Sequence, residues 1–218
     1  MATARRHFDF DPSLLHPFTA MVVGPTQCGK TQFVLKMLRC ASSFIHPPPE
    51  RIVWCYGCYQ DAFRSLCHDD SCNIEFHEGL PDVDMLDGCK RTLMIIDDLM
   101  SETDSRVTNI FTKGSHHKNA SVVYISQNLF SKCRENRTIS LNTHYLVLFK
   151  NPRDTLQITH LGRQMFPERV KYFREAYADA TSHPYGYLLV DLKTTTPDVL
   201  RLRTDIFPDE RTMVYVYK

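Results

Sequence analysis

The stretch Gly24-Pro25-Thr26-Gln27-Cys28-Gly29-Lys30-Thr31 decides the fold of this 218-residue chain. It satisfies the P-loop pattern G-x-x-x-x-G-K-[ST] at every fixed position. A short apolar run, residues 18–23, precedes it, and apolar side chains at helical spacing follow it over residues 33–38. Strand, loop and helix in that order are the context that the motif requires. The alternative is a chance match in a glycine-bearing turn.

The residue types of this stretch fit a triphosphate. Gly24 and Gly29 let the backbone curl so that successive N–H groups point at phosphate oxygens, beside the positive end of the following helix. Lys30 places a cation next to the β- and γ-phosphates, and the Thr31 hydroxyl can ligate Mg²⁺. The motif therefore predicts binding of ATP and magnesium. The expected nucleotide contacts are Gly24, Pro25, Thr26, Gln27, Cys28, Gly29, Lys30, Thr31 and Gln32.

A second apolar stretch, residues 93–96, ends in the carboxylates Asp97 and Asp98. Ligands of open α/β sheets bind at the carboxyl ends of the strands, and the stretch resembles a Walker B element. Asp97 is then expected to hold Mg²⁺ through its water shell, while Asp98 orients or deprotonates the attacking water. The alternative is an acidic N-cap for a helix that begins near Ser101.

Other polar residues are candidates for the reaction itself. Gln127 follows the apolar run 121–125 and is predicted to sense the γ-phosphate or position water, with a surface glutamine as the alternative. An arginine from a neighbouring subunit often stabilises the transferring phosphoryl group in oligomeric ATPases. The candidates are Arg134, Arg137 and Arg153, each of which has a solvated surface charge as its alternative.

Strand-like runs at 51–56, 73–77, 92–96, 121–125 and 144–149 alternate with polar or helical stretches. Because parallel neighbours need crossover connections, the pattern predicts an α/β fold, a RecA/ASCE-like three-layer sandwich with a mostly parallel sheet. Runs at 187–192 and 199–207 flank a turn and predict an antiparallel hairpin at the sheet edge. Residues 1–16 lack periodicity and are expected to form a partly mobile arm, leaving 17–218 as one P-loop domain.

The composition is that of a globular protein, with 43% hydrophobic and 23% charged residues. A net charge of +1 gives no global basic field, so contact with nucleic acid requires a local patch or several copies around the strand. No apolar stretch approaches the roughly 20 residues of a membrane span, and the N-terminus lacks the apolar centre of a secretory signal. We expect a protein that is not secreted.

The 8 cysteines are expected to be free thiols in a reducing compartment. A tetrahedral zinc site is the alternative, because several cysteines and a histidine lie close together in the sequence. Its ligands would come from Cys55, Cys58, Cys67, His68 and Cys72.

Several classes of P-loop protein fit the sequence poorly. A GTPase needs an N-K-x-D-type element, which the sequence lacks, and a two-domain helicase needs a second core of similar size. A second acid after the apolar strand, together with Gln127, favours water as the nucleophile. A kinase, or an ATPase that regulates a protein and does not act on DNA, stays open as the alternative.

The chain resembles the DNA-packaging ATPases of the FtsK-HerA superfamily, in the branch found in Polinton/Maverick elements, adintoviruses and large DNA viruses that include poxviruses. The resemblance rests on four segments: G-P-T-Q-C-G-K-T (24–31), L-M-I-I-D-D-L-M (93–100), H-H-K-N-A-S-V-V-Y-I-S-Q-N-L-F (116–130) and S-L-N-T-H-Y-L-V-L-F-K-N-P-R-D (140–154). The first is shared by many families, and the last two are more specific. The resemblance extends from about Phe18 to the C-terminus.

The resemblance implies an Mg-dependent ATPase that moves double-stranded DNA into a capsid as a ring of subunits, with a hexamer favoured. Lys30 and Thr31 would bind phosphate and Mg²⁺, Asp97 would coordinate Mg²⁺, and Gln127 would be the sensor. Asp98 would activate the water; it stands where the wider superfamily usually has glutamate, although the viral branch often has aspartate. Arg137 is the first choice for the trans-acting arginine. The implied locations are the virion and the host nucleus or cytoplasm, and Arg106, Lys113 and Lys118 are candidates for the lining of a DNA channel.

Overall fold

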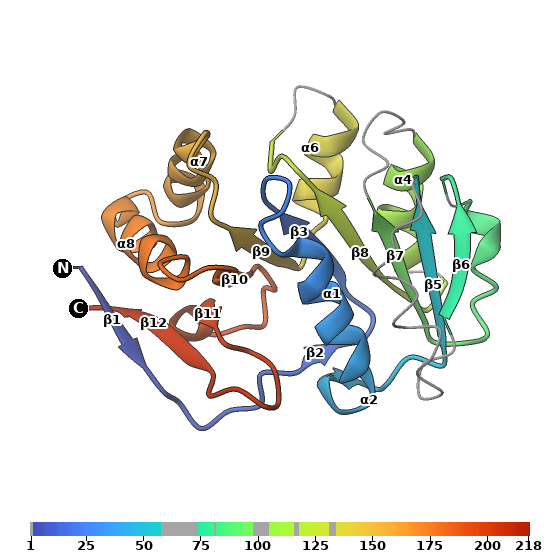
Figure 1. Ribbon diagram of the computed structural model, residues 1–218, viewed down its shortest axis with the longest axis horizontal. Helices are drawn as coiled ribbons and strands as arrows, with labels where there is room; N and C mark the ends of the chain where they lie inside the picture. Colours follow the sequence, from blue (N-terminus) through green and yellow to red (C-terminus); the bar gives the residue numbers. More distant parts are fainter. Residues whose placement is uncertain (1, 58–73, 81, 98–104, 116–117, 131–133) are drawn as a thin grey trace.

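The computed structural model describes residues 2–57, 74–80, 82–97, 105–115, 118–130 and 134–218. Its centre is a ten-stranded sheet in the order β1-β12-β11-β10-β9-β3-β8-β7-β5-β6 (Figure 1). The strands from β9 to β6 run parallel to one another. They are β3 (Thr19–Val23), β5 (Arg51–Tyr56), β6 (Ile74–Glu78), β7 (Thr92–Asp97), β8 (Ala120–Ser126) and β9 (Tyr145–Phe149).

The other end of the sheet is antiparallel. Strand β10 (Tyr187–Asp191) pairs antiparallel with β9 on one side and with β11 (Leu202–Thr204) on the other. The predicted hairpin is therefore present, but it is not the edge. Strand β12 (Met213–Tyr217) follows β11, and β1 (Thr3–Arg6) completes the sheet.

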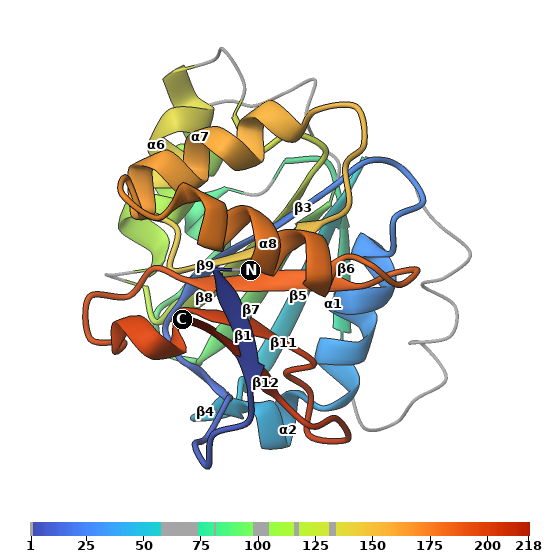
Figure 2. The same cartoon turned by 90° about the vertical axis from the view of Figure 1, so that its left-hand side faces the viewer.

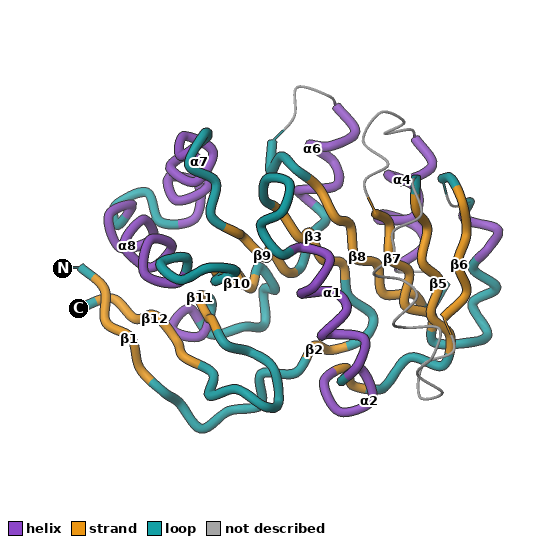
Figure 3. Tube along the Cα trace, in the orientation of Figure 1, coloured by secondary structure: helices purple, strands orange, loops and turns teal. Residues whose placement is uncertain are grey.

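Helices cover both faces of the sheet, as Figures 2 and 3 show. Helices α1 (Lys30–Arg39) and α2 (Ala41–Phe44) pack in one apolar core, which includes Ala20 and Val22 of β3. The intervening residues Met21 and Val23 belong to the second core, on the opposite face. That core contains side chains of α4 (Ser105–Asn109), the π-helical turn Ile110–Gly114, α6 (Arg134–Leu141), α7 (Thr155–Met165) and α8 (Val170–Ala180).

The alternation within β3 explains why the central strands are continuously apolar. A strand that is covered on both faces buries every side chain, and all five residues of β3 are buried. The fold is thus a mixed α/β structure with a large, mostly parallel sheet, as the sequence predicts. Among the described residues, no helix combines the length and apolarity needed to cross a membrane.

The N-terminal segment differs from the expected arm. Residues 3–6 pair with β12 in the register Thr3↔Tyr217 to Arg6↔Val214, and the Thr3 N–H donates to a carboxylate oxygen of Glu175 (3.1 Å). Further along, β2 (Leu14–Leu15) pairs with β4 (Ile45–His46). An edge strand held by backbone hydrogen bonds needs no apolar periodicity, which is why the local sequence pattern does not reveal it.

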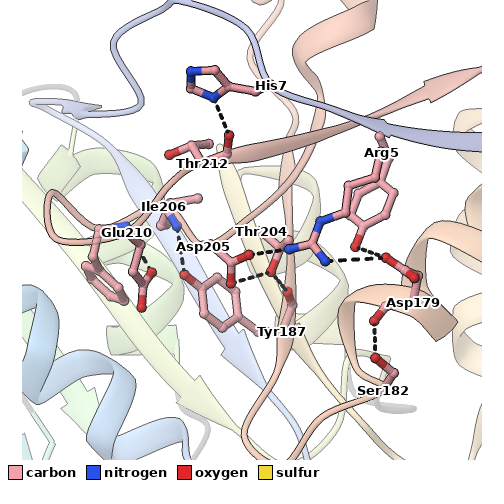
Figure 4. A network of polar contacts seen from close by, with 12 residues as sticks. Arg5, His7, Asp179, Ser182, Tyr187, Thr204, Asp205, Ile206, Glu210 and Thr212 are labelled. Carbon is pink, nitrogen blue, oxygen red and sulfur yellow. Dashed lines mark hydrogen bonds and ion pairs between the residues drawn. The ribbon is translucent and has the colours of Figure 1, made fainter.

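Polar side chains fasten this strand to the domain (Figure 4). The Arg5 guanidinium lies 2.5 Å from a carboxylate oxygen of Asp205 and 4.0 Å from one of Asp179. The His7 ring lies 3.0 Å from the carbonyl oxygen of Thr212, and the Tyr215 hydroxyl donates to Asp179 (2.7 Å). The first residues of the chain are therefore part of the folded sheet.

Candidate functional site

The loop between β3 and α1 adopts a tight curl at the carboxyl end of β3. The Gly24 N–H donates to the carbonyl oxygen of Ser126 (3.2 Å), which ties the start of the loop to the end of β8. Inside the loop, the Cys28 N–H donates to the carbonyl oxygen of Pro25 (3.4 Å). Gln27 (φ 65°) and Gly29 (φ 107°) both have left-handed backbone conformations. The predicted strand, loop and helix are thus present in that order.

Each glycine of the motif meets a different requirement. A Cβ on Gly24 would lie 2.6 Å from the Cys28 Sγ and 2.7 Å from the Phe149 Cβ, so any larger residue would collide with the loop and with β9. Gly29 sits at the N-cap of α1 with its positive φ, a conformation that costs other residues about 1–2 kcal/mol. The loop therefore needs space at its start and backbone freedom at its end.

The first turn of α1 is open to an anion. The first four N–H groups of a helix have no partner inside the helix. Here the N-cap residue Gly29 makes no side-chain capping bond, and the first turn contains no acidic residue. Together with the helix dipole, these N–H groups give the loop a positive potential that suits phosphate.

Lys30 places its ammonium group inside the curl. Its Nζ donates to the carbonyl oxygens of Gly24 (2.7 Å) and Pro25 (2.9 Å). An ammonium group has three donors, so a third N–H can reach a phosphate oxygen while the loop carbonyls hold the other two. The lysine is thereby positioned by its own loop.

Asp97 ends β7 at the same edge of the sheet and is 3% exposed. Along β7, Leu93 and Ile95 pack in the core beneath α1, and because side chains alternate, Asp97 faces that side as well. The register pairs Asp97 with Ile125 of β8, and Val23 of β3 with Ser126. Since neighbouring strands lie about 4.8 Å apart, Asp97 is roughly 10 Å from the end of β3. Asp98 lies outside the described residues.

The other predicted residues are spread more widely. Gln127 is half-buried and follows Ser126, the residue whose carbonyl accepts the Gly24 N–H. It therefore lies beside the start of the loop. Arg137 is exposed on α6, and Arg153 is exposed after β9. Helix α6 packs with the core opposite α1, so Arg137 belongs to the other side of the sheet from the phosphate loop.

The structure describes the side chains of only two of the remaining candidates for DNA contact or for the trans-acting arginine. Arg106 is exposed on α4, and Lys118 is half-buried just before β8. The side chains of Lys113 and Arg134 lie outside the described part of the chain.

The cysteine cluster is only partly described. Cys55 is fully buried in β5 and packs in the core on the α4 and α6 face, and this burial raises the pKa of its thiol to about 12. That environment favours a structural thiol over a metal ligand. Cys58, Cys67, His68 and Cys72 lie outside the described residues. Within the described ranges, no group of three or more His, Cys, Asp or Glu side chains is placed to hold a metal.

A magnesium site of the predicted kind does not need such a cluster. Mg²⁺ keeps several waters and is commonly held by one or two protein ligands together with substrate phosphates. The Thr31 hydroxyl, in the first turn of α1, and the buried Asp97 carboxylate are oxygen donors of the right kind on the same face of the sheet. The residues present therefore fit Mg²⁺ bound with a nucleotide.

The sequence does not predict the cavity that opens beside the loop. Its volume is about 470 Å³, and its walls are residues 25–28, Lys150, Pro152 and residues 182–186. Segments far apart in the chain meet here, because β9 is the neighbour of β3 in the sheet and β10 is the next strand beyond β9. The proline and glycine of the 182–186 segment signal only a turn, not its position against the P-loop.

The fold and the loop define a class: a mixed α/β domain in which a loop with the P-loop sequence pattern joins β3 of the main sheet to α1. No protein-family model matches the sequence, and no curated protein matches it. Among solved structures, the chain is similar to the genome packaging NTPase B204 from Sulfolobus turreted icosahedral virus 2, determined in complex with ATP-gammaS. The two are 9% identical, the match covers 82% of this chain and 94% of that chain, and the TM-score is 0.53. At that identity the likeness is one of fold.

Proposed function

We propose that this protein is a Mg-dependent ATPase that packages the genome of a virus, or of a virus-like transposon, by moving double-stranded DNA into a capsid. The observation that carries the proposal is the position of Asp97 relative to α1. The Asp97 carboxylate is buried, and the N-terminus of α1 has no side-chain cap. Both lie at the carboxyl ends of the strands, on the same face of the sheet. The glycine-bounded loop precedes α1, and the Lys30 ammonium group is turned into that loop. This is the arrangement that a Mg-triphosphate requires.

The proposed division of roles follows from the chemistry of each side chain. Backbone N–H groups of the loop and Lys30 bind the phosphates, and Thr31 and Asp97 would hold Mg²⁺, which neutralises charge on the β- and γ-oxygens. Gln127 positions a water whose oxygen bonds to the γ-phosphorus as the bond to the β–γ bridging oxygen breaks. Asp98 accepts the water proton. An arginine of a neighbouring subunit, with Arg137 as the first choice, stabilises the developing charge.

The sheet order is consistent with a RecA/ASCE-like domain of the FtsK-HerA type, with the Polinton/Maverick–adintovirus branch as the finer assignment. One strand, β8, lies between the P-loop strand β3 and the Asp97 strand β7. Gln127 is the residue that directly follows β8. This strand order supports a water-positioning role for Gln127, which follows the strand between the P-loop strand and the Asp97 strand.

Because a net charge of +1 gives no global basic field, contact with DNA would need cations from several copies of the chain around the strand. A ring, with a hexamer favoured, lines its channel by repeating a few cations from each subunit, and the candidates are Arg106, Lys113 and Lys118. Such contacts recognise the backbone, so binding is independent of sequence and sensitive to salt. The partners are then double-stranded DNA and a capsid or portal-vertex protein, and the expected location is the virion or the host nucleus or cytoplasm.

The alternative is a P-loop NTPase with another role, such as a kinase or an ATPase that regulates a protein. Hydrolysis measured with and without duplex DNA separates the two. We expect Mg-dependent hydrolysis that duplex DNA stimulates and that added salt reduces toward the DNA-free rate. Hydrolysis that is indifferent to duplex DNA would contradict the packaging role and favour the alternative.

A further inference from the structure

The cavity beside the P-loop lies on the side away from Asp97. Strand β3 has β8 and β7 on one side and β9 and β10 on the other. The cavity walls outside the loop come from the segment that follows β9 and the segment that precedes β10. A triphosphate that lies along the loop with its terminal phosphate toward Asp97 therefore directs its nucleoside into this cavity.

The size and chemistry of the cavity suit a nucleobase. Small-molecule sites have volumes of about 300–1,000 Å³, and this one measures about 470 Å³. Three prolines, Pro25, Pro152 and Pro184, and the aromatic Tyr185 contribute flat apolar surface. None of the described residues that line the cavity is a carboxylate, the group that would select guanine by accepting its N–H donors.

Tyr185 has two features that packing alone does not explain. It is 71% exposed, although aromatic side chains usually bury most of their surface, and it holds a left-handed backbone conformation with φ 62°. Such a conformation is strained in a residue other than glycine, asparagine or aspartate. Its ring nevertheless lies against the loop, because a Cβ on Gly29 would be 3.1 Å from the Tyr185 Cδ1. The strain thus presents an aromatic surface beside the phosphate loop.

Hydrogen bonds hold the backbone next to each outer wall of the cavity, and the first set links α8 to the segment after β9. The Tyr177 hydroxyl of α8 donates to the carbonyl oxygen of Phe149 (2.9 Å) and accepts the Asn151 N–H (3.0 Å). At the other wall, the Thr181 hydroxyl donates to the Tyr177 carbonyl oxygen (2.8 Å) and the Gly186 N–H donates to that of His183 (3.1 Å). The backbone that leads into each wall is therefore held by hydrogen bonds within the protein.

We propose that this cavity binds the purine base of the nucleotide and that Tyr185 binds it by stacking. The proposal rests on the proposed function, because it assumes that the triphosphate occupies the P-loop. Base stacking on an aromatic side chain tolerates different bases, since every base has a π-face. Tyr185 is then a residue that determines affinity for the nucleoside and makes no contact with the phosphates.

The test compares two ligands that differ only in the nucleoside, ATP and inorganic triphosphate. Tyr185→Asn removes the ring while keeping a residue that tolerates the left-handed conformation, and Tyr185→Phe keeps the ring. We expect Tyr185→Asn to weaken ATP binding roughly tenfold, within the range measured for base stacking, and to leave triphosphate binding unchanged. Tyr185→Phe should bind both ligands as the wild type does. Val199→Asn, at an exposed apolar position (53% exposed) outside the cavity, is the matched control and should have no effect.

The outcomes separate this inference from the proposed function. Unchanged ATP affinity in Tyr185→Asn would overturn the stacking site, as would an equal loss for ATP and triphosphate. In both cases the P-loop assignment stands if Lys30→Ala abolishes binding of both ligands. A wild-type protein that binds neither ATP nor triphosphate overturns the proposed function together with this inference.

Discussion

The backbone N–H of Gly24 donates a hydrogen bond to the carbonyl oxygen of Ser126 across 3.2 Å. This bond joins the first residue of the phosphate loop to the strand that lies between β3 and the Asp97 strand. Gln127 directly follows Ser126, the last residue of that strand. One backbone contact thus sets the spacing between the loop that would bind phosphate and the segment that would position water.

Lys30→Ala should abolish nucleotide binding and hydrolysis. The Lys30 ammonium is held inside the loop by two carbonyl oxygens, so its loss removes the only side-chain cation of residues 24–31. Arg39→Ala, at an exposed position in the last turn of the same helix, is the matched control. Calorimetric titration with ATP checks both variants. Comparable affinities in Lys30→Ala and Arg39→Ala would contradict the assignment.

Asp97→Asn should lower hydrolysis by at least about a hundredfold and remove the contribution of Mg²⁺ to ATP binding. The substitution keeps the shape of the buried side chain and removes the charge that would hold the metal through its water shell. ATP affinity in the presence of a chelator should stay at the wild-type value. Asp84→Asn, an exposed acid in the turn Val83–Met85, controls for loss of a carboxylate. An Asp97→Asn variant with normal Mg dependence would refute the proposed role.

Gly24→Ala should destabilise the domain by about 1–3 kcal/mol and weaken ATP binding, because the added methyl group meets both Cys28 and Phe149. Gly79→Ala gives the comparison. Gly79 has a φ of 92° and nothing within 4 Å of an added Cβ, so its substitution carries a backbone penalty without a collision. We expect Gly79→Ala to lower stability by about 1–2 kcal/mol with normal ATP affinity. Denaturant unfolding and ATP titration measure the two effects, and identical behaviour of both variants would contradict this account.

The buried ion pair between Asp191 and Arg203 should stabilise the antiparallel end of the sheet only as a pair. Both side chains are 5% exposed, and burial lowers the pKa of the Arg203 guanidinium. Asp191→Asn leaves that cation without its carboxylate and should cost about 3–5 kcal/mol in the free energy of unfolding. Asp198→Asn breaks a surface pair with Arg201 and should cost less than about 1 kcal/mol. Equal losses in the two variants would show that the burial of the first pair is irrelevant.

The parallel half of the fold follows from local sequence patterns. The apolar run 51–56 coincides with β5, the run 92–96 is one residue shorter than β7 at its end, and the run 121–125 is one residue shorter than β8 at each end. Continuous apolar strands bury both faces and therefore leave a strong signal. The P-loop leaves an equally strong sequence signal. Its first glycine is required because a Cβ would collide with neighbouring side chains, and its second because the backbone has a positive φ.

The antiparallel half is less visible in the sequence. β1 is charged at Arg5 and Arg6 and is held by pairing with β12 and by ion pairs to residues more than 170 positions away, which no local window contains. The cavity walls at Lys150 and Tyr185 likewise depend on contacts between residues that are far apart in the sequence. They meet the P-loop because β9 lies beside β3 in the sheet and β10 lies beside β9.

The central claim is that one Mg²⁺ lies between Thr31 and Asp97 when the nucleotide is bound. The most direct measurement is a crystal structure with a slowly hydrolysed ATP analogue and Mn²⁺ in place of Mg²⁺, with the metal located by anomalous scattering. We predict a single metal about 2.1 Å from the Thr31 hydroxyl oxygen, linked to Asp97 through water, with the phosphates on the loop N–H groups. A metal or triphosphate bound elsewhere on the protein, or a metal out of reach of Asp97, would contradict the account.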